Sequence, residues 1–171
     1  EGSSHNKYIE IYNPTSATVD LAGYAYPNSN NGASFEGVHD FWNVFDSGAT
    51  IGPGGFYVIC HPSATSTIQG FCGETHTYLS NGDDGYCLVR CSGGTCPRTD
   101  PGAGSLSAFS DYVILDCVGD FSATDPGSGW AACGDSRATQ DNTLVRKCDV
   151  TTGNGGDWAE SAGTNAGDCE W

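Results

Sequence analysis

Apolar and polar residues alternate at the start of the chain in the pattern of a half-buried β-strand. Residues 7–12 read Lys-Tyr-Ile-Glu-Ile-Tyr, so the two isoleucines share one face while the tyrosines and Glu10 share the other. Pro14 ends this strand, because proline has no backbone N–H to give to a ladder. A continuous apolar run at residues 56–59 is typical of a core strand. Comparable patterns predict further strands at residues 19–21, 24–26, 39–45, 86–90, 112–119 and 143–147.

Segments rich in Gly, Pro, Ser and Asn separate these strands. They lie at residues 27–37, 51–55, 80–85 and 92–110, and only residues 64–69 and 136–142 have the pattern of short helical turns. Short strands between regular turn signals predict an all-β sandwich or barrel. With no internal repeat and no linker, we expect residues 1–171 to form a single domain.

Composition narrows the class of protein. The 25 glycines suit a turn-rich β fold better than a helical one, and a hydrophobic fraction of 37% argues against disorder. The chain has 21 acidic and 6 basic residues and a net charge of −15, which would repel a phosphate backbone. We therefore expect no nucleic-acid partner. No apolar run approaches the ~20 residues of a membrane span.

Nine cysteines, no methionine and a first residue Glu1 predict a processed, secreted chain or a piece of a longer precursor. Short spacing favours two disulfides across tight loops, and two strands that can pair antiparallel favour a third, with Val89 opposite Leu115. A fourth disulfide would hold the C-terminal segment and leave Cys133 free or bonded outside the chain. In the order of this argument, the favoured pairs are Cys60–Cys72, Cys91–Cys96, Cys87–Cys117 and Cys148–Cys169.

Two metal sites can be weighed. Cys60, His61, Cys72 and His76 have a zinc-like composition but lack the closely spaced cysteine pair of ordinary zinc sites, so a disulfide is favoured. Calcium has acidic candidates in turns, although no D-x-D-x-D-G loop is present, and aspartates in turns commonly bond their own backbone. The candidates are Asp83, Asp84, Asp120 and Asp125, with Asp116 and Asp141 nearby.

No motif of an enzyme is present. The segment Gly127-Ser128-Gly129 falls short of a G-x-S-x-G elbow, the four histidines are scattered, and paired carboxylates for glycoside hydrolysis have no defining spacing. Four tryptophans suit a sandwich core better than a sugar-binding platform. Pro14 blocks the one Asn-x-Thr sequence, which leaves O-linked glycans as the open form of glycosylation. We expect no catalysis and no cofactor.

Three groups of residues together resemble the lamin tail domain in its secreted form. They are YIEIYNP at 8–14 with VDLAGY at 19–24, IGPGGFYVI at 51–59, and LSNGDD at 79–84 with VILDCVG at 113–119. The resemblance implies an immunoglobulin-like β-sandwich over residues 1–120, followed by a loop-rich, disulfide-stapled extension over 121–171. It also implies binding or structural use without catalytic residues. The usual chain of the family has one further strand before the position of Glu1.

These observations predict a non-catalytic extracellular module, in its most concrete form the repeating subunit of a surface assembly or filament. The expected partners are copies of the chain or other extracellular proteins. The expected contact is an open edge along Tyr8, Ile9, Glu10, Ile11 and Tyr12, because unpaired backbone groups accept a further strand. The alternatives are an accessory domain of a secreted hydrolase or nuclease and a calcium- or carbohydrate-binding module.

Overall fold

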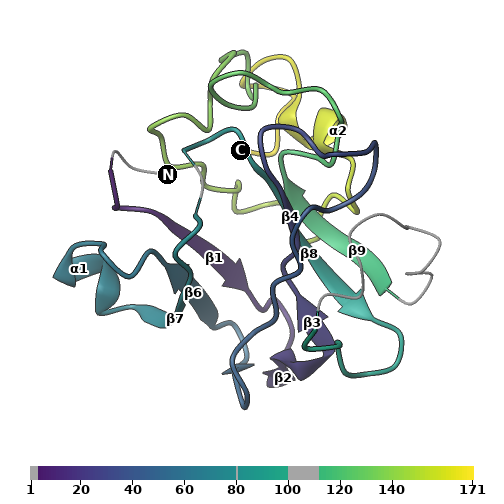
Figure 1. The fold of residues 1–171 in the computed structure, drawn as a ribbon. Helices are drawn as coiled ribbons and strands as arrows, with labels where there is room; N and C mark the ends of the chain where they lie inside the picture. The colour runs from purple at the N-terminus through teal and green to yellow at the C-terminus, as the bar shows by residue number, and fades with distance from the viewer. Residues whose placement is uncertain (1–3, 80, 100–111) are drawn as a thin grey trace.

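A computed structural model describes residues 4–79, 81–99 and 112–171 of the chain. The protein is mostly β, with two larger sheets facing each other (Figure 1). The first sheet has the order β1-β6-β7, where β1 is Tyr8–Tyr12, β6 is Phe56–Cys60 and β7 is Cys72–Thr75. Strands β1 and β6 are antiparallel, whereas β6 and β7 are parallel and joined through the short helix α1 (Ser66–Gln69).

The second sheet is built around β8 (Gly85–Cys91). Strand β9 (Tyr112–Val118) pairs along β8, and the two-residue strands β3 (Tyr24–Ala25) and β4 (Asn28–Ser29) pair with it as well. A small separate pair is formed by β2 (Val19–Asp20) and β5 (Thr50–Ile51), and the helices η1 and α2 complete the elements at Leu21–Gly23 and Trp158–Ala162. This is the immunoglobulin-like sandwich that the sequence predicts.

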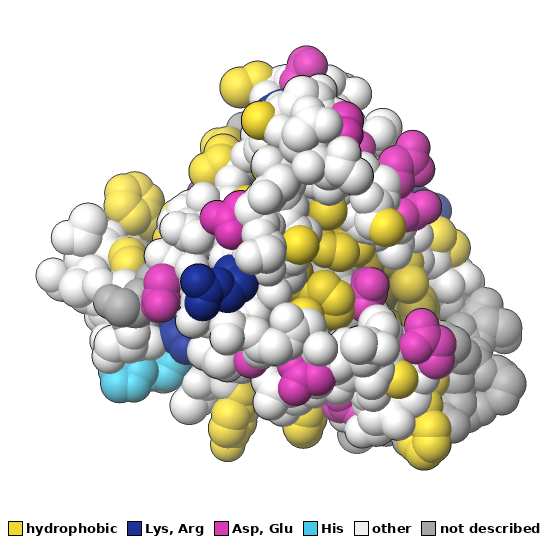
Figure 2. Space-filling model, turned by 90° about the horizontal axis from the view of Figure 1, so that it is seen from above, with side chains coloured by type: hydrophobic (Ala, Val, Ile, Leu, Met, Phe, Trp, Pro, Cys, Tyr) yellow, Lys and Arg dark blue, Asp and Glu magenta, His cyan; other side chains and the backbone are white. Residues whose placement is uncertain are grey.

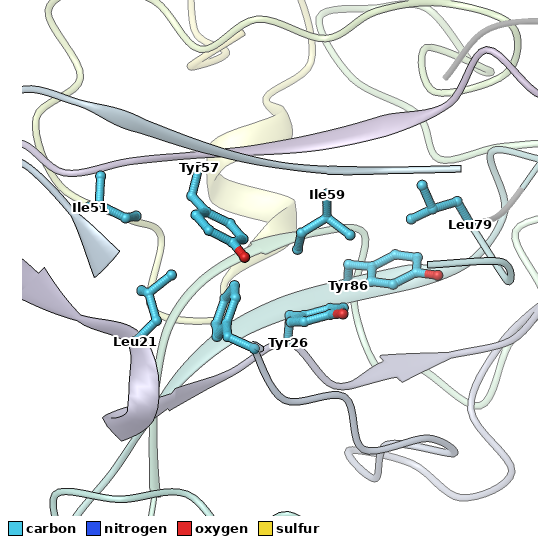
Figure 3. Packing of buried hydrophobic residues seen from close by; sticks show 8 residues of the cluster. Leu21, Tyr26, Ile51, Tyr57, Ile59, Leu79 and Tyr86 are labelled. Atoms are coloured by element: carbon cyan, nitrogen blue, oxygen red, sulfur yellow. The ribbon is translucent and has the colours of Figure 1, made fainter. Parts of the chain in front are cut away.

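The main core lies between the two sheets. Side chains of Tyr57 and Ile59 on β6 point toward Tyr26 and Tyr86 from the opposite side, with Leu21 filling one end (Figure 3). Ile9 and Ile11 of β1 pack against the same cluster. The half-buried strand predicted from the alternation of residues 7–12 is therefore confirmed, because the isoleucines face inward and the tyrosines face outward.

Two further apolar clusters extend the molecule beyond the sandwich. The other face of β8 carries Cys87, Val89 and Cys91, which pack with Ala33 and Phe121. The third cluster belongs to the C-terminal extension and is built on Trp130 and Trp158 with Ala132, Ala138 and Ala162, and Val118 of β9 packs against it. The extension is thus packed against the end of β9 and curls over the sandwich (Figure 1).

Several predicted elements differ from the structure. Residues 39–45 make only isolated bridges, Phe41 to Asn28 and Val44 to Ala25, because the neighbouring strands are two residues long and offer no continuous ladder. Residues 143–147 form no strand, since they are held by side-chain contacts of the extension. Strands β4, β5 and β7 and helices η1 and α2 were not predicted, β5 includes Ile51 of the predicted turn, and residues 136–142 form turns without a helix. Residue 80 and residues 100–110 of the predicted loops lie outside the described residues.

Candidate functional site

Among the described residues, one long edge of the first sheet is unpaired. The N–H of His61 donates to the carbonyl of Lys7 (3.0 Å) and the N–H of Asn13 to the carbonyl of Gly55 (3.0 Å), so the backbone at both ends of β1 is bonded toward β6. Backbone groups of successive residues alternate in direction along a strand. Ile9 and Ile11 therefore bond β6, and the N–H and C=O groups of Tyr8, Glu10 and Tyr12 point away from it. We call these groups the β1 edge.

The β1 edge has no backbone partner within the described part of the chain. β1 pairs with β6 alone, and none of the backbone hydrogen bonds formed outside the strand ladders involves Tyr8, Glu10 or Tyr12. Buried backbone groups are almost always paired, and exposed ones are satisfied by water until another strand replaces it. This edge is consequently a place where an extended segment can be added to the sheet.

Apolar side chains line the outer face beside this edge. Tyr12 and Phe56 lie opposite each other on β1 and β6, with ring centroids 5.0 Å apart, and remain 53% and 58% exposed. Tyr8 and Val58 lie on the same face and are half-buried, and Glu10 between the two tyrosines is exposed. We define the outer face as the side chains of Tyr8, Glu10, Tyr12, Phe56 and Val58.

The inner side of β1 holds the edge in place. Ile9 and Ile11 anchor the strand in the core, and the buried side chain of Asn13 closes its end. The Nδ2 of Asn13 donates to the carbonyls of Ala17 (2.8 Å) and Ile51 (3.0 Å). An added strand would thus meet a backbone that is already ordered, which lowers the entropic cost of binding.

A buried carboxylate, Glu74, links the two sheets behind this surface. It accepts hydrogen bonds from the hydroxyls of Tyr26 (2.7 Å) and Tyr57 (2.9 Å) and from the N–H of Asp46 (2.8 Å), while only 8% of the residue is exposed. A bulge places it there, because Gly73 is an extra residue between Cys72, opposite Val58, and Glu74, opposite Ile59. The sequence analysis missed this residue.

The two tyrosines respond to this environment. Burial raises the pKa of Tyr26 well above its ordinary value, and the hydrogen bond to Glu74 raises it further. The pKa of Tyr57 is raised for the same two reasons. Both hydroxyls therefore stay protonated and donate to the carboxylate. These hydrogen bonds are suited to holding the two sheets in register, because the hydroxyls of Tyr26 and Tyr57 reach one carboxylate from the two sides of the core.

Three predicted disulfides are present. They are Cys60–Cys72, Cys87–Cys117 and Cys91–Cys96. The register of β8 and β9 differs from the predicted one in one detail. A bulge between Leu88 and Val89 places Val89 opposite Ile114 instead of Leu115.

The predicted Cys148–Cys169 pair is wrong, because Cys169 is bonded to Cys133. The N–H of Cys133 donates to the carbonyl of Ala162 (2.8 Å) and that of Glu170 to the carbonyl of Ser161 (2.8 Å). The end of α2 thereby brings the two cysteines together, with Cα atoms 5.2 Å apart. Cys148 is exposed and free.

The zinc interpretation fails because Cys60 and Cys72 are joined in a disulfide and present no thiolate. The ring of His61 stacks on His5, with centroids 4.5 Å apart, and His76 packs edge-on against Tyr26. Burial lowers the pKa of His76. Across the described residues, no group of three or more His, Cys, Asp or Glu side chains could hold a metal ion.

The four calcium candidates accept hydrogen bonds from groups of the protein itself. Asp83 is buried and accepts from the Nδ2 of Asn81 (3.0 Å), and Asp84 accepts from the N–H of Asn31 (3.1 Å). The Oδ1 of Asp120 accepts from the N–H of Ser122 and that of Asp125 from the N–H of Gly127, both at 2.7 Å. Burial raises the pKa of Asp120, and the bond from Ser122 opposes this. Asp120 and Asp125 thus follow the turn-capping alternative, whereas Asp84 bonds the backbone of a distant loop and Asp83 a neighbouring side chain.

Two shallow hollows remain on the surface. One is lined by Asp20, Tyr24, Arg90, Ser92 and Val113 and the other by Pro126, Trp130, Ser136, Trp158 and Ala162. Neither brings a nucleophile, a base and an orienting group together among the described residues. Trp130 and Trp158 are buried in the core of the extension, so they have a core role but lie outside the sandwich core in which tryptophans were expected.

The disulfides and the helices bear on where the protein is found. Four disulfides are compatible with an extracellular protein, since such bonds persist in oxidising surroundings. In the described ranges, the helices are all too short or too polar to cross a bilayer.

Comparison with known proteins gives one match. The family described as Lamin Tail Domain matches residues 1–100, which include every strand of the sandwich except β9. Searches of curated proteins and of solved structures found no significant match. The family consists of non-enzymatic immunoglobulin-like domains that act in protein interaction. Because this match covers more than half of the sequence, the chain belongs to the lamin tail domain family.

Proposed function

We propose that this domain is a non-catalytic protein-interaction module of the extracellular space that is joined to its neighbours by strand addition at the β1 edge. The observation that carries the proposal is the row of unpaired backbone groups at Tyr8, Glu10 and Tyr12, on a strand fixed by the core. Strand addition uses such groups directly, because main-chain hydrogen bonds supply affinity and the flanking side chains supply specificity.

The most concrete form of the proposal is a repeating subunit of a surface assembly or filament. A head-to-tail contact that does not close on itself generates a chain of subunits. Four disulfides support this use, because they hold a small domain together outside the cell. The exposed Tyr12 and Phe56 also support it, since aromatic residues are enriched at protein interfaces.

Light scattering over a range of concentrations, combined with amide hydrogen exchange, tests the proposal. For the self-assembling form, the expected result is a particle mass that rises above 17.8 kDa with concentration, together with slower exchange at Tyr8, Glu10 and Tyr12. Glu10→Pro removes one N–H from the edge and should abolish both effects. A matched Thr75→Pro, on β7 at the other end of the sheet, should leave them in place.

Two negative outcomes have different meanings. A mass that stays at 17.8 kDa while the edge amides exchange quickly removes the self-assembling form and leaves an open edge for another protein. A mass that stays there while these amides exchange as slowly as those of Ile9 and Ile11 means that the chain covers its own edge. The whole proposal then fails.

A further inference from the structure

We infer that the segment accepted by the β1 edge is a basic strand of another protein, with Lys or Arg opposite Glu10 and apolar residues two positions to either side. The inference rests on the proposed function, because it presupposes that β1 accepts a strand. It adds the chemistry of the partner and, of the two forms of the proposed function, favours the one in which another protein occupies the edge.

The alternation of β1 fixes which partner side chains matter. A residue paired directly opposite Glu10 presents its side chain on the same outer face, as do the residues opposite Tyr8 and Tyr12. The residues between them point toward the side of the sheet that carries Ile9 and Ile11. Every second side chain of an added strand therefore lies on the outer face. These are the side chains opposite Tyr8, Glu10 and Tyr12.

Glu10 sets the charge of this contact. On the outer face of β1, β6 and β7 it is the one charged side chain, because Glu74 points into the core. No ion pair of Glu10 is formed within the described residues. Opposite charges across a strand pair stabilise it and like charges destabilise it. A Lys or Arg opposite Glu10 would complete the pair.

The whole molecule has the same preference. Its net charge is −15, and Figure 2 shows acidic side chains spread over one face of the molecule, with few basic ones among them. A field of one sign concentrates ligands of the other sign and speeds their association. A cationic segment is favoured at long range by the net charge and at contact by Glu10.

The same argument disfavours β1 of a second copy as the added strand. The antiparallel register that uses all three edge residues places Glu10 directly opposite Glu10 of the other copy. Registers shifted by two residues avoid this contact but lose one of the three pairs. Two bodies of charge −15 also repel each other. A basic segment has neither disadvantage.

The flanking positions call for apolar side chains. Opposite Tyr12 an aliphatic residue would lie beside an aromatic pair that is more than half exposed, Tyr12 and Phe56. Opposite Tyr8 it would lie beside a half-buried ring. Aromatic and β-branched residues are favourable cross-strand partners. The partner sequence is thus apolar-x-basic-x-apolar in an extended conformation.

A charge-swap experiment with short peptides tests this. The probe is Thr-Val-Thr-Lys-Thr-Val-Thr, acetylated and amidated, which reads the same in both strand directions, and its counterpart has Glu in place of Lys. Amide chemical shifts of the ¹⁵N-labelled protein report binding at Tyr8, Glu10 and Tyr12. We expect the Lys peptide to bind roughly two- to fivefold more tightly than the Glu peptide. With Glu10→Lys this preference should reverse, although the protein stays strongly acidic.

Two controls separate the contact from general attraction. A peptide with Pro in place of both the Val and the Thr that precede Lys keeps the charge but lacks an N–H that faces β1 in either strand direction, so it should lose binding. Equal binding of this peptide, or a preference that Glu10→Lys does not reverse, would overturn the inference.

The remaining outcomes separate this inference from the proposed function. If the edge amides become protected as the protein concentration rises, and neither peptide competes, a second copy occupies the edge. The basic-strand inference then fails while the proposed function stands. If the edge stays unprotected and neither peptide binds, both fail.

Discussion

Glu74 is a charged side chain whose three hydrogen bonds are all made inside the sandwich. Two of the donors, Tyr26 and Tyr57, come from facing sides of the core, so a single carboxylate connects the sheets. A hydrogen bond to a charged group contributes more than a neutral one, and removing one partner leaves a costly buried charge. The carboxylate therefore requires both tyrosines to stay protonated.

This requirement predicts how stability depends on pH. The pKa of Tyr26 is raised in the folded protein, so its contribution is fully present below the ordinary tyrosine pKa of about 10 and is lost as the pH rises through the higher folded value. We expect the free energy of unfolding to fall above about pH 10. In Tyr26→Phe the fall should be shallower by about 1.4 kcal/mol per pH unit.

Urea unfolding between neutral pH and pH 11 measures this, with the exposed Tyr78→Phe as the matched control. A wild-type slope that Tyr26→Phe leaves unchanged would show that the Glu74 contacts do not govern alkaline unfolding.

The cysteines of the extension give a second prediction at the residue scale. Cys133–Cys169 closes a loop of sequence separation 36, whereas Cys148 is free and exposed. A loop of that length corresponds to about 4 kcal/mol in the chain-entropy description. Cys133→Ser should therefore be strongly destabilised and Cys148→Ser should unfold like the wild type.

A thiol titration without reductant checks the assignment directly. One equivalent of reactive thiol is expected for the wild type and none for Cys148→Ser. A protein in which Cys148→Ser exposes a new thiol would contradict the pairing.

At the scale of single elements, the backbone N–H groups of β1 alternate between two directions. The N–H groups of Ile9 and Ile11 bond β6, and those of Tyr8, Glu10 and Tyr12 face the open edge. Proline removes one N–H at either kind of position, but only at Ile9 or Ile11 does this break a hydrogen bond of the β1–β6 ladder. We expect Ile9→Pro to be much less stable than Glu10→Pro.

Urea midpoints of the two variants, compared with Ile9→Ala and Glu10→Ala, isolate the backbone effect from the loss of each side chain. Similar proline penalties at both positions would mean that the edge of β1 is bonded in solution, which is the opposite of the direction assigned here.

The elements that were predicted share a strong local signal. Strands β1, β6, β8 and β9 have alternating or continuous apolar patterns, and the spacing of Cys91 and Cys96 permits few partners. Strand β7, by contrast, reads Cys-Gly-Glu-Thr and is made a strand by its neighbour β6. The Cys133–Cys169 bond likewise depends on how α2 folds, which no spacing reveals.

The site was partly visible in the sequence. The pattern of residues 7–12 gives both faces of β1, and hence the outward position of Glu10. Which backbone groups are free could not be predicted, because that depends on the pairing partner and its register with β6. Glu74 was hidden for a similar reason: its inward direction comes from the bulge at Gly73, where an added Cβ would meet the ring of Tyr57.

At the scale of the whole molecule, Arg146 is one of several links between the extension and the sandwich, beside the hydrogen bonds of Asn154 with Cys117 and of Thr139 with Gly82. Its guanidinium bonds Asp116 of β9 and Glu170 near the C-terminus, both at 2.9 Å, and lies 4.2 Å from the ring centre of Trp171. Only 17% of the Arg146 side chain is exposed. Through these contacts the extension shares charges with a strand of the sandwich, so we expect the two parts to unfold as a single domain.

Arg146→Met tests this coupling while keeping much of the apolar stem. We expect it to lower the free energy of unfolding by about 1–3 kcal/mol, since two partly buried carboxylates lose their partner. Trp130, Trp158 and Trp171 report on the extension by fluorescence, and far-UV circular dichroism reports mainly on the strands. In a single cooperative domain both signals shift together to a lower urea midpoint. Arg137→Met, an exposed change of the same type within the extension, should leave the midpoint unchanged. If fluorescence moves alone in Arg146→Met and the strands unfold at the wild-type midpoint, the extension is an independent unit resting on the sandwich.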